Sequence, residues 1–480
     1  MSFSGVPFLC FLAVFLVLYG LCPPRYRRYL LPVGSVIFIA LGSWKAALWA
    51  LLFTAANYVL GVCIQRTAFR KLTMALAVAV DGLALVTFKL LGVGMLGLSY
   101  YLFSFMAYLV EVYRGTVQAE LDPVRFASFG FFFPKFTMGP ITRYSELGPQ
   151  LDKSRISAAN IQKGLQGFTL GFILKLLVAD KLGVFFGEGY HALKTVGYDA
   201  ISTELAWLGV VVTSLHIYIE WIAYMYMALG IARMLGFQLP ENFNYPYIAR
   251  TVGDYYRRWP MTLTRWFKDF IYIPLGGSRR GLARTVVNVL FVWLLTSLWH
   301  GVGLAPNYLI WGMSIGVMIV LERLWKTFVT ERFRVGAKLG DGLPGKLWKL
   351  LVSLLAHIWV VVPMILSWLV FTIKDLDQLG LYFSRLFPAA GSSAGADPAD
   401  FAKNWELVGP AVVVGVIFCL PVLNWLKALL GRFELGRRVL RFMDSRLAAW
   451  IVSAVLAGLF WYAVFVLTQK GSDPMGYAAF

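Results

Sequence analysis

The sequence contains four histidines that could carry out acid–base chemistry. They are His191, His216, His300 and His357. His300 ends the run LLTSLWHG and lies 16 positions after Arg284, the last residue of a basic segment. On a straight helix that spacing is ~24 Å, deep within an apolar element. An imidazole held there can be neutral and basic, which suits a general base acting on a hydroxyl. Position alone leaves a structural role open as well.

Glu220 is the second candidate, because it lies within the apolar run 204–234. A carboxylate inside such a run is costly and is commonly functional. His216 precedes it by one helical turn, so the two side chains can share a face. A buried pair that ties helices together is an equally good interpretation. We interpret His357 as structural, since a lone histidine on a helix usually finds a backbone partner, and His191 as a solvated loop residue.

A basic and aromatic stretch, RRWPMTLTRWFKDFIYIPLGGSRRG, occupies residues 257–281. Pro260 suits the first turn of a helix. Five apolar residues then follow on one stripe at helical spacing, which predicts an amphipathic helix at a membrane face that ends at Gly276 and Gly277. The stripe consists of Leu263, Trp266, Phe267, Phe270 and Ile271, whereas Thr262, Arg265, Lys268 and Asp269 fall elsewhere.

Two roles are open for the cations of this stretch. They can anchor the chain to anionic lipid, or they can hold an anionic substrate such as coenzyme A at the mouth of a tunnel. The cations in question are Arg257, Arg258, Arg265, Lys268, Arg279 and Arg280.

Several kinds of site are excluded. No Ser-His-Asp set, phosphate-binding glycine loop or metal-ligand cluster occurs. The four cysteines form no Cys-x-x-Cys pair and lie in or beside apolar runs, so we predict neither disulfides nor a metal site. The net charge of +19 does not indicate nucleic acid here, because loops on the cytoplasmic side of a membrane protein accumulate Lys and Arg.

The elements that must position these residues are membrane helices. Hydrophobic residues make up 59% of the 480 and charged residues only 14%, too few for a water-soluble surface. Apolar runs long enough to cross the bilayer recur, and we predict an all-α integral membrane protein with about 11–12 transmembrane helices. The runs lie at 5–22, 29–43, 46–64, 73–92, 95–112, 162–186, 204–234, 285–304, 306–324, 349–372, 408–427 and 447–468. We read the first as a retained span and expect the seventh to be broken or tilted.

Loop charge sets the orientation. With the N-terminus outside, every predicted inner loop is rich in Lys and Arg and every outer loop is poor in them, so both termini face outside. Residues 126–138 (FASFGFFFPKFTM) are apolar but too short to cross, and we predict a re-entrant or interfacial segment whose irregular backbone is shielded by protein. Residues 388–400 are small and polar, typical of a flexible loop. No internal repeat is evident.

Five passages in the same order resemble the membrane-bound O-acyltransferase (MBOAT) family, above all its bacterial alginate O-acetyltransferase branch. They are MAYLVEVYRG (106–115), FFFPKFTMGPITRY (131–144), IARMLGFQLPENFNYPYIAR (231–250), the basic aromatic stretch, and SLWHG (297–301). The resemblance implies one MBOAT domain over residues 1–480, in which re-entrant and amphipathic helices complete a barrel around a central tunnel. N-terminal spans occupy residues 1–112, the catalytic core 113–330 and C-terminal spans 331–480.

The resemblance also implies the chemistry. His300 matches the family's active-site histidine, with Trp299 beside it and Glu220 and Thr262 as possible supporting residues. The donor would be acetyl-CoA, bound as a substrate rather than a tight cofactor, with the six cations on its phosphates. The acetyl group would pass to an extracytoplasmic SGNH-type acetyltransferase that esterifies a polysaccharide. The protein would be a multi-pass protein of the bacterial inner membrane.

The sequence departs from the family in two places. Bacterial members usually carry a second histidine where this chain has Pro260, and proline has neither a donor nor a titratable group. The passage around Glu220 reads EWIAYMYMA where relatives read like DFSGYSDMA. Two alternatives therefore remain: D-alanyl transfer from a carrier protein to teichoic acid, and a non-catalytic transporter or scaffold for polysaccharide export.

Overall fold

The computed structural model shows the chain as helices joined by short loops. It describes residues 2–91, 97–184, 198–301, 305–330, 342–388, 397 and 399–471, and within these ranges there is no strand. His191 and most of the loop 388–400 lie outside the described residues. The chain divides into two compact units, described here one at a time: Met1–Leu177, Glu220–Asn242 and Arg438–Phe480 form the first, and Val178–Ile219 and Phe243–Arg437 form the second.

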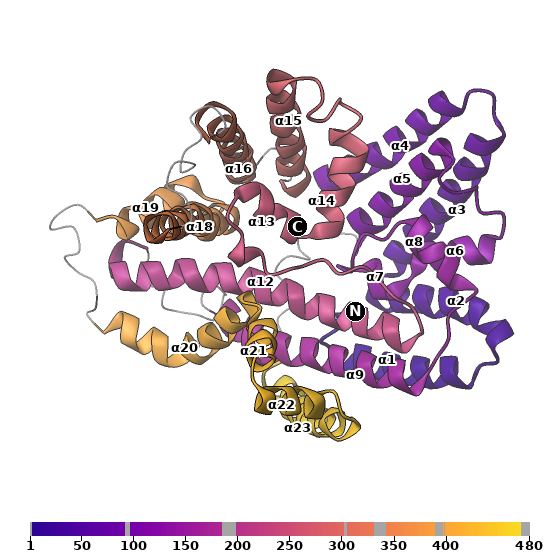
Figure 1. The fold of residues 1–480 in the computed structure, drawn as a ribbon. Coiled ribbons are helices and arrows are strands. Elements are labelled where there is room, and N and C mark those ends of the chain that lie inside the picture. The colour runs from indigo at the N-terminus through magenta and orange to yellow at the C-terminus, as the bar shows by residue number, and fades with distance from the viewer. Residues whose placement is uncertain are drawn as a thin grey trace. The chain divides into compact units, whose positions relative to one another are not determined.

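The first unit is made mostly of the N-terminal helices (Figure 1). Its helices are α1 (Val6–Leu21), α2 (Pro24–Gly42), α3 (Trp44–Arg66), α4 (Arg70–Leu90), α5 (Leu98–Arg114), α6 (Pro123–Phe131), α7 (Phe133–Phe136), α8 (Tyr144–Leu151), α9 (Ala158–Ile173) and α23 (Arg446–Lys470). Helices α3, α4 and α5 pack side by side, and α23 packs on α9. The start of the π-helical segment η1 (Leu174–Ala179) and the end of α12 (Thr203–Met234) also belong to this unit.

Local sequence explains where several of these helices begin and how closely they pack. The hydroxyl of Ser43 accepts a hydrogen bond from the Ala46 N–H at the start of α3, and Ser157 caps α9 in the same way. Gly61 of α3 faces the ring of Tyr108 in α5, where an added Cβ would lie 2.6 Å from the ring. This glycine therefore permits the close approach of two membrane helices.

A buried polar contact joins α3 to α4 within their apolar spans. Asn57 Nδ2 donates to Asp81 Oδ1 at 3.1 Å and to the Phe53 carbonyl at 3.0 Å. Both side chains are buried. Between helices surrounded by hydrocarbon, a hydrogen bond of this kind favours one pairing of the helices over others.

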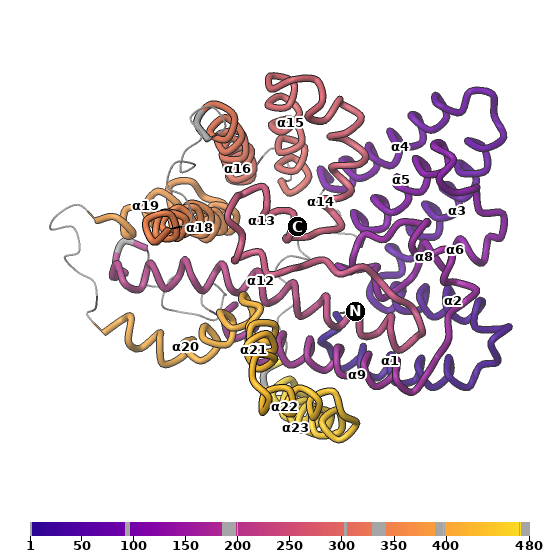
Figure 2. The backbone as a smooth tube through the Cα atoms, viewed as in Figure 1, coloured from indigo at the N-terminus to yellow at the C-terminus, as the bar shows by residue number. Residues whose placement is uncertain are grey.

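The second unit carries His300. Its elements are α10 (Asp180–Gly183), η2 (Tyr198–Ala200), the first part of α12, η3 (Pro246–Ile248), α13 (Val252–Arg258), α14 (Met261–Phe267), η4 (Lys268–Tyr272), α15 (Leu282–His300), α16 (Pro306–Trp325), η5 (Lys326–Thr330), α18 (Leu343–Thr372), α19 (Leu376–Leu386), α20 (Asp400–Cys419), α21 (Val422–Leu430) and the start of α22 (Glu434–Met443), whose remainder belongs to the first unit. Helices α15 and α16 run beside each other, as the tube in Figure 2 shows.

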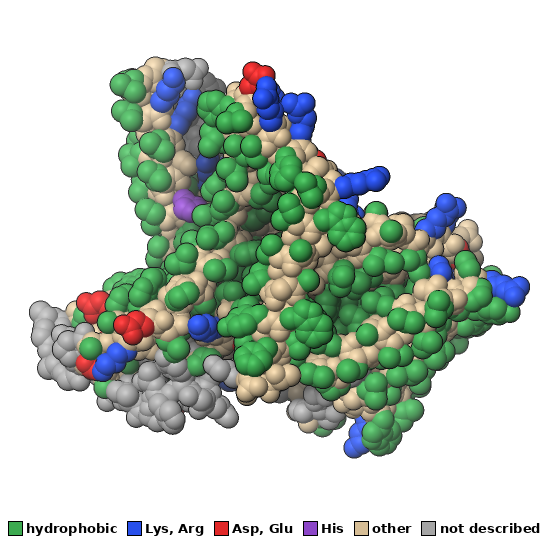
Figure 3. All heavy atoms as spheres, turned by 90° about the horizontal axis from the view of Figure 1, so that it is seen from below, with side chains coloured by type: hydrophobic (Ala, Val, Ile, Leu, Met, Phe, Trp, Pro, Cys, Tyr) green, Lys and Arg blue, Asp and Glu red, His purple; other side chains and the backbone are tan. Residues whose placement is uncertain are grey.

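Eight helices of the described residues are long and apolar enough to cross a membrane. They are Trp44–Arg66, Arg70–Leu90, Thr203–Met234, Leu282–His300, Pro306–Phe328, Leu343–Thr372, Asp400–Cys419 and Arg446–Gln469. Many large hydrophobic side chains point outward, and Figure 3 shows hydrophobic side chains spread widely among the described residues of one face. A surface of this kind is typical of lipid contact rather than contact with water.

A helix forms at each of the twelve predicted positions, so the all-α membrane prediction is confirmed. Of the two possibilities for the seventh span, the break is excluded, because Thr203–Met234 is a single unbroken helix. One predicted position was wrong. The eleventh predicted helix, 408–427, is placed too far toward the C-terminus. The helix in the structure ends at Cys419, and a new one begins after Pro421. Proline supplies no N–H to continue the helix.

The predicted re-entrant segment is interrupted and buried in the first unit. Helix α6 ends at Phe131, Phe132 leaves the helical conformation, and α7 extends for only four residues. Nearly every residue from 126 to 142 is buried. At Gly139 an added Cβ would lie 2.4 Å from Lys135 Cα, so only glycine fits this tight return. The burial agrees with the expectation that irregular backbone in a membrane protein is shielded by the protein itself.

Candidate active site

His300 is the last residue of α15, and aromatic rings enclose it. The side chain is buried, with 6% of the residue exposed. The ring of Trp311 meets it edge-on at 5.1 Å between centroids, and that of Phe371 does so at 5.2 Å. Tyr308 lies 6.2 Å away in a stacked arrangement. An imidazole held among these rings can act as a general base when it is in its neutral form.

The rings around His300 continue into a larger cluster within the second unit. Trp368 contacts Phe371 at 5.6 Å and Trp259 at 5.0 Å between centroids. Rings packed at these distances form an apolar environment, in which electrostatic interactions are stronger than in water.

Two glycines explain why α15 and α16 lie close enough for the rings to pack around His300. A Cβ at Gly312 would lie 2.1 Å from Ser297 Oγ, and one at Gly316 would lie 3.0 Å from Trp293 Cβ. The helix backbones therefore approach along a stripe of small residues. This approach brings Trp311, which precedes Gly312, against His300.

The cluster contains buried donors. Within the described part of the chain, Trp311 Nε1 and the Tyr256 hydroxyl have no hydrogen-bond partner. Burial raises the pKa of Tyr256 well above its usual range, so this hydroxyl keeps its proton at neutral pH. A buried donor without an acceptor costs roughly 1–3 kcal/mol. The indole N–H of Trp311 is the more relevant of the two, because its ring contacts His300.

The basic aromatic stretch forms a short α-helix followed by a π-helical segment. Pro260 stands at the start of α14, as predicted, and Leu263, Trp266 and Phe267 are buried. The predicted α-helical spacing ends at Lys268, where the chain changes to the π-helical η4, and Phe270 and Ile271 are half-exposed. Thr262, predicted to lie off the stripe, is also buried.

The six candidate cations have different environments. Arg257 and Arg258 both pair with Asp254, at 3.3 and 2.8 Å. Arg265 is half-buried on α14, whereas Lys268, Arg279 and Arg280 are exposed. Gly276 and Gly277 turn the chain with positive φ angles of 105° and 56°. The exposed cations are therefore the ones available to attract an anion by long-range charge.

Glu220 forms a buried ion pair in the first unit with a residue that the sequence analysis missed. Lys175 Nζ lies 2.9 Å from Glu220 Oε1, and the two side chains are 1% and 4% exposed. Lys175 belongs to η1, which lies within the predicted span 162–186. A lysine inside that span was the available signal, since an intramembrane charge usually has an opposite charge nearby.

His357, also in the second unit, contacts a backbone carbonyl, which is the kind of partner predicted for it. His357 Nδ1 lies 3.1 Å from the Ala249 carbonyl oxygen, which ties α18 to the loop after η3. Trp299 is half-buried next to His300, with 4.4 Å between the ring centroids.

Comparison with known proteins adds independent evidence. The model of the MBOAT, membrane-bound O-acyltransferase family matches residues 105–358. A probable alginate O-acetylase of Pseudomonas fluorescens is 34% identical over 339 residues, which is 67% of this chain and 66% of that protein. The chain thus spans about two thirds of the length of that relative.

Two other relatives act on other polymers, as their names state. A peptidoglycan O-acetyltransferase of Helicobacter pylori is 34% identical over 43% of this chain and 38% of its own length. A teichoic acid D-alanyltransferase of Bacillus subtilis is 25% identical over 47% of this chain and 58% of its own length.

Proposed function

Because this chain belongs to the membrane-bound O-acyltransferase family and is a multi-pass membrane protein, we propose that it transfers an acetyl group for the O-acetylation of an exopolysaccharide or cell-wall polymer. The donor is acetyl-CoA on the cytoplasmic side of a bacterial inner membrane. The observation that supports this most strongly is the burial of His300 among aromatic rings at the end of α15.

His300 acts as the general base in this proposal. The acceptor hydroxyl gives its proton to His300 while its oxygen attacks the thioester carbonyl. Collapse of the tetrahedral intermediate breaks the C–S bond, and the imidazolium returns the proton to the departing thiolate. The products are an oxygen ester and free coenzyme A. Exclusion of water by the surrounding rings protects the thioester from hydrolysis.

Trp311 supplies the hydrogen bond to the developing oxyanion. The family histidine that Pro260 replaces is absent, so another donor must act near His300. Thr262 and backbone N–H groups are the alternatives from sequence. Trp311 is favoured, because its N–H is buried and has no acceptor among the described residues while its ring lies against His300.

We therefore expect Trp311→Phe to lower the acyl transfer rate by roughly 10²–10³-fold, the usual effect of removing one oxyanion donor. Phenylalanine keeps most of the ring packing and removes only the N–H. The rate is measured with radiolabelled acetyl-CoA in membrane vesicles, at matched protein levels.

Trp293→Phe is the matched control, since this indole belongs to the same helix pair and contacts the Trp311 ring at 5.9 Å. Its rate should remain within a few-fold of wild type. Equal rates for Trp311→Phe and wild type would instead show that Thr262 or a backbone N–H donates the hydrogen bond to the oxyanion.

The cytoplasmic mouth attracts the donor. Lys268, Arg279 and Arg280 are exposed on the stretch after α14, and they favour the approach of the coenzyme A phosphates. The acetyl group then passes to an extracytoplasmic SGNH-type acetyltransferase or directly to the polysaccharide.

The choice of donor tests the proposal against its nearest rival. Similarity to a teichoic acid D-alanyltransferase keeps D-alanyl transfer as the alternative. Purified protein in lipid vesicles is offered labelled acetyl-CoA or a labelled D-alanyl carrier protein. Transfer from acetyl-CoA alone supports O-acetylation, and transfer from the carrier alone supports the rival. If neither donor reacts while deletion of the protein still abolishes surface O-acetylation, the non-catalytic scaffold is favoured.

A further inference from the structure

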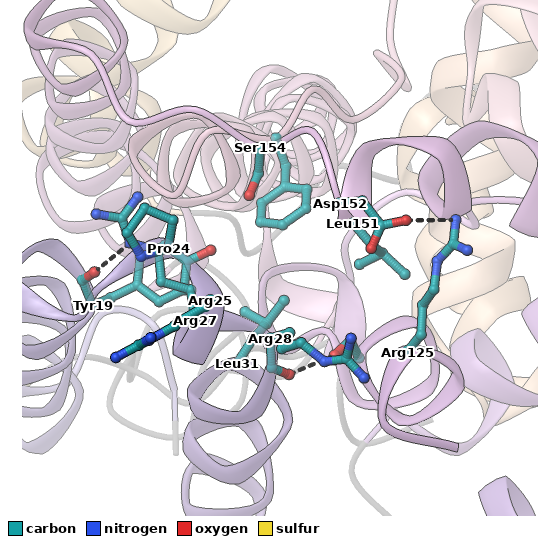
Figure 4. A pocket seen from close by; sticks show the side chains of 12 residues that line it. Tyr19, Pro24, Arg25, Arg27, Arg28, Leu31, Arg125, Leu151, Asp152 and Ser154 are labelled. Carbon is teal, nitrogen blue, oxygen red and sulfur yellow. Dashed lines mark hydrogen bonds and ion pairs between the residues drawn. The ribbon is translucent and has the colours of Figure 1, made fainter. Parts of the chain in front are cut away.

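The first unit contains an arginine-lined cavity of about 200 Å³ that the acyl transfer mechanism does not use (Figure 4). It lies where α1 ends, α2 begins and α8 leads into the following loop. Four arginines from two helices line it, together with two serine hydroxyls, and these residues are Arg25, Arg27, Arg28, Arg125, Ser128 and Ser154.

Only part of the positive charge of the cavity is neutralised by acids. Arg28 pairs with Asp122 at 2.5 Å. Arg125 pairs with Asp152, itself a lining residue, and with Glu120, each at 3.3 Å. Four arginines against three acids leave a charge of +1.

The two remaining arginines have neutral neighbours. Arg27 Nε donates to the carbonyls of Cys22 at 2.9 Å and Tyr19 at 3.1 Å, which satisfies the end of α1 without cancelling the charge. Arg25 lies against the ring of Tyr26, with 4.7 Å between its guanidinium carbon and the ring centroid. Both guanidinium groups therefore favour an additional anion.

The donor groups suit a phosphate. A guanidinium presents five N–H donors in a fork that matches phosphate oxygens. The cavity also lies at the start of α2, a 19-residue helix, and the N-terminus of a helix adds partial positive charge. A volume of about 200 Å³ leaves space for a phosphate and part of the group esterified to it.

We propose that this cavity binds the phosphate of an anionic phospholipid headgroup. The flank of the cavity favours a lipid over a free phosphate, because Leu18 and Leu21 at the end of α1 are 51% and 79% exposed and can contact acyl chains. The loop charges place this end of α1 and α2 on the cytoplasmic side, where basic pockets between membrane helices bind anionic headgroups. This inference does not depend on the proposed function.

The test compares thermal unfolding midpoints in nanodiscs of phosphatidylcholine alone and of phosphatidylcholine mixed with phosphatidylglycerol. The wild-type protein should gain roughly 2–4 °C from phosphatidylglycerol, as expected for a ligand that binds only the folded state. Arg25→Gln should lose most of this gain, and its folding should not change, because the Arg25 side chain contacts the Tyr26 ring and makes no hydrogen bond or ion pair with the described residues. Ser154→Asp should lose the gain too, because its carboxylate occupies the cavity.

Arg66→Gln is the matched control, since Arg66 is an exposed basic residue at the end of α3 on the same predicted side. It should retain the full gain. Equal gains in the wild type, Arg25→Gln and Ser154→Asp would overturn the proposal and show only a general surface effect. In a further arm, inorganic phosphate is added to the phosphatidylcholine nanodiscs. If it reproduces the whole gain, the lipid is excluded as the source of the phosphate.

Discussion

Replacing His300 by alanine should lower acyl transfer by roughly 10²–10⁴-fold, the usual contribution of a positioned general base. The change removes the group that accepts the hydroxyl proton. Water cannot readily replace the imidazole as the base, because aromatic rings enclose His300. The measurement is transfer from labelled acetyl-CoA in vesicles, together with the O-acetyl content of the surface polymer in cells that carry the variant.

His357→Gln is the control, because His357 lies in the same unit and contacts only a backbone carbonyl in the described hydrogen bonds. Its transfer rate should stay within a few-fold of wild type. Intact O-acetylation in His300→Ala cells, where deletion of the whole protein abolishes it, would refute the catalytic role and favour the scaffold.

The second large effect concerns stability. Either Lys175→Met or Glu220→Leu should lower the free energy of unfolding by roughly 3–5 kcal/mol, because each leaves a buried charge without its counter-charge. The double variant should recover most of the loss, since two apolar side chains of similar volume replace a pair whose desolvation is costly. Pairwise coupling is measured by a double-mutant cycle.

Unfolding midpoints and the fraction of monodisperse protein after heating in detergent report the result. Lys163→Met is the control for Lys175→Met, because Lys163 lies on α9 at an exposed position. If the two single changes added up to the double change, the ion pair would carry no coupling and Glu220 would need another explanation.

The sequence predicted the helices well because one physical requirement dominates them. A backbone in hydrocarbon must satisfy its own hydrogen bonds, so each long apolar run becomes a helix. The interruption at residues 126–138 was predictable as well, since Pro134 cannot donate an N–H to a preceding helical turn and a Gly139–Pro140 pair marks a turn. The end of α20 at Cys419 was misplaced, because apolar character continues past Pro421 and hides the boundary.

The candidate site was only partly predictable. His300 stood out because few titratable groups occur in the apolar runs. Trp311 did not stand out, since the sequence has 17 tryptophans. Nothing in the sequence around Trp311 indicates that its indole N–H finds no acceptor among the described residues. The Lys175–Glu220 pair joins positions 45 residues apart, and helix periodicity relates only near neighbours.

The π-helical segment Leu174–Ala179 points its side chains in directions that they would not have in a regular α-helix. Such a segment contains one residue more than the α-helical path requires, as if a single amino acid had been inserted there. Loss of one residue from it would regularise the backbone and turn everything beyond by about 100°. Lys175 is buried within this segment, so loss of the residue before it would turn its ammonium group away from Glu220.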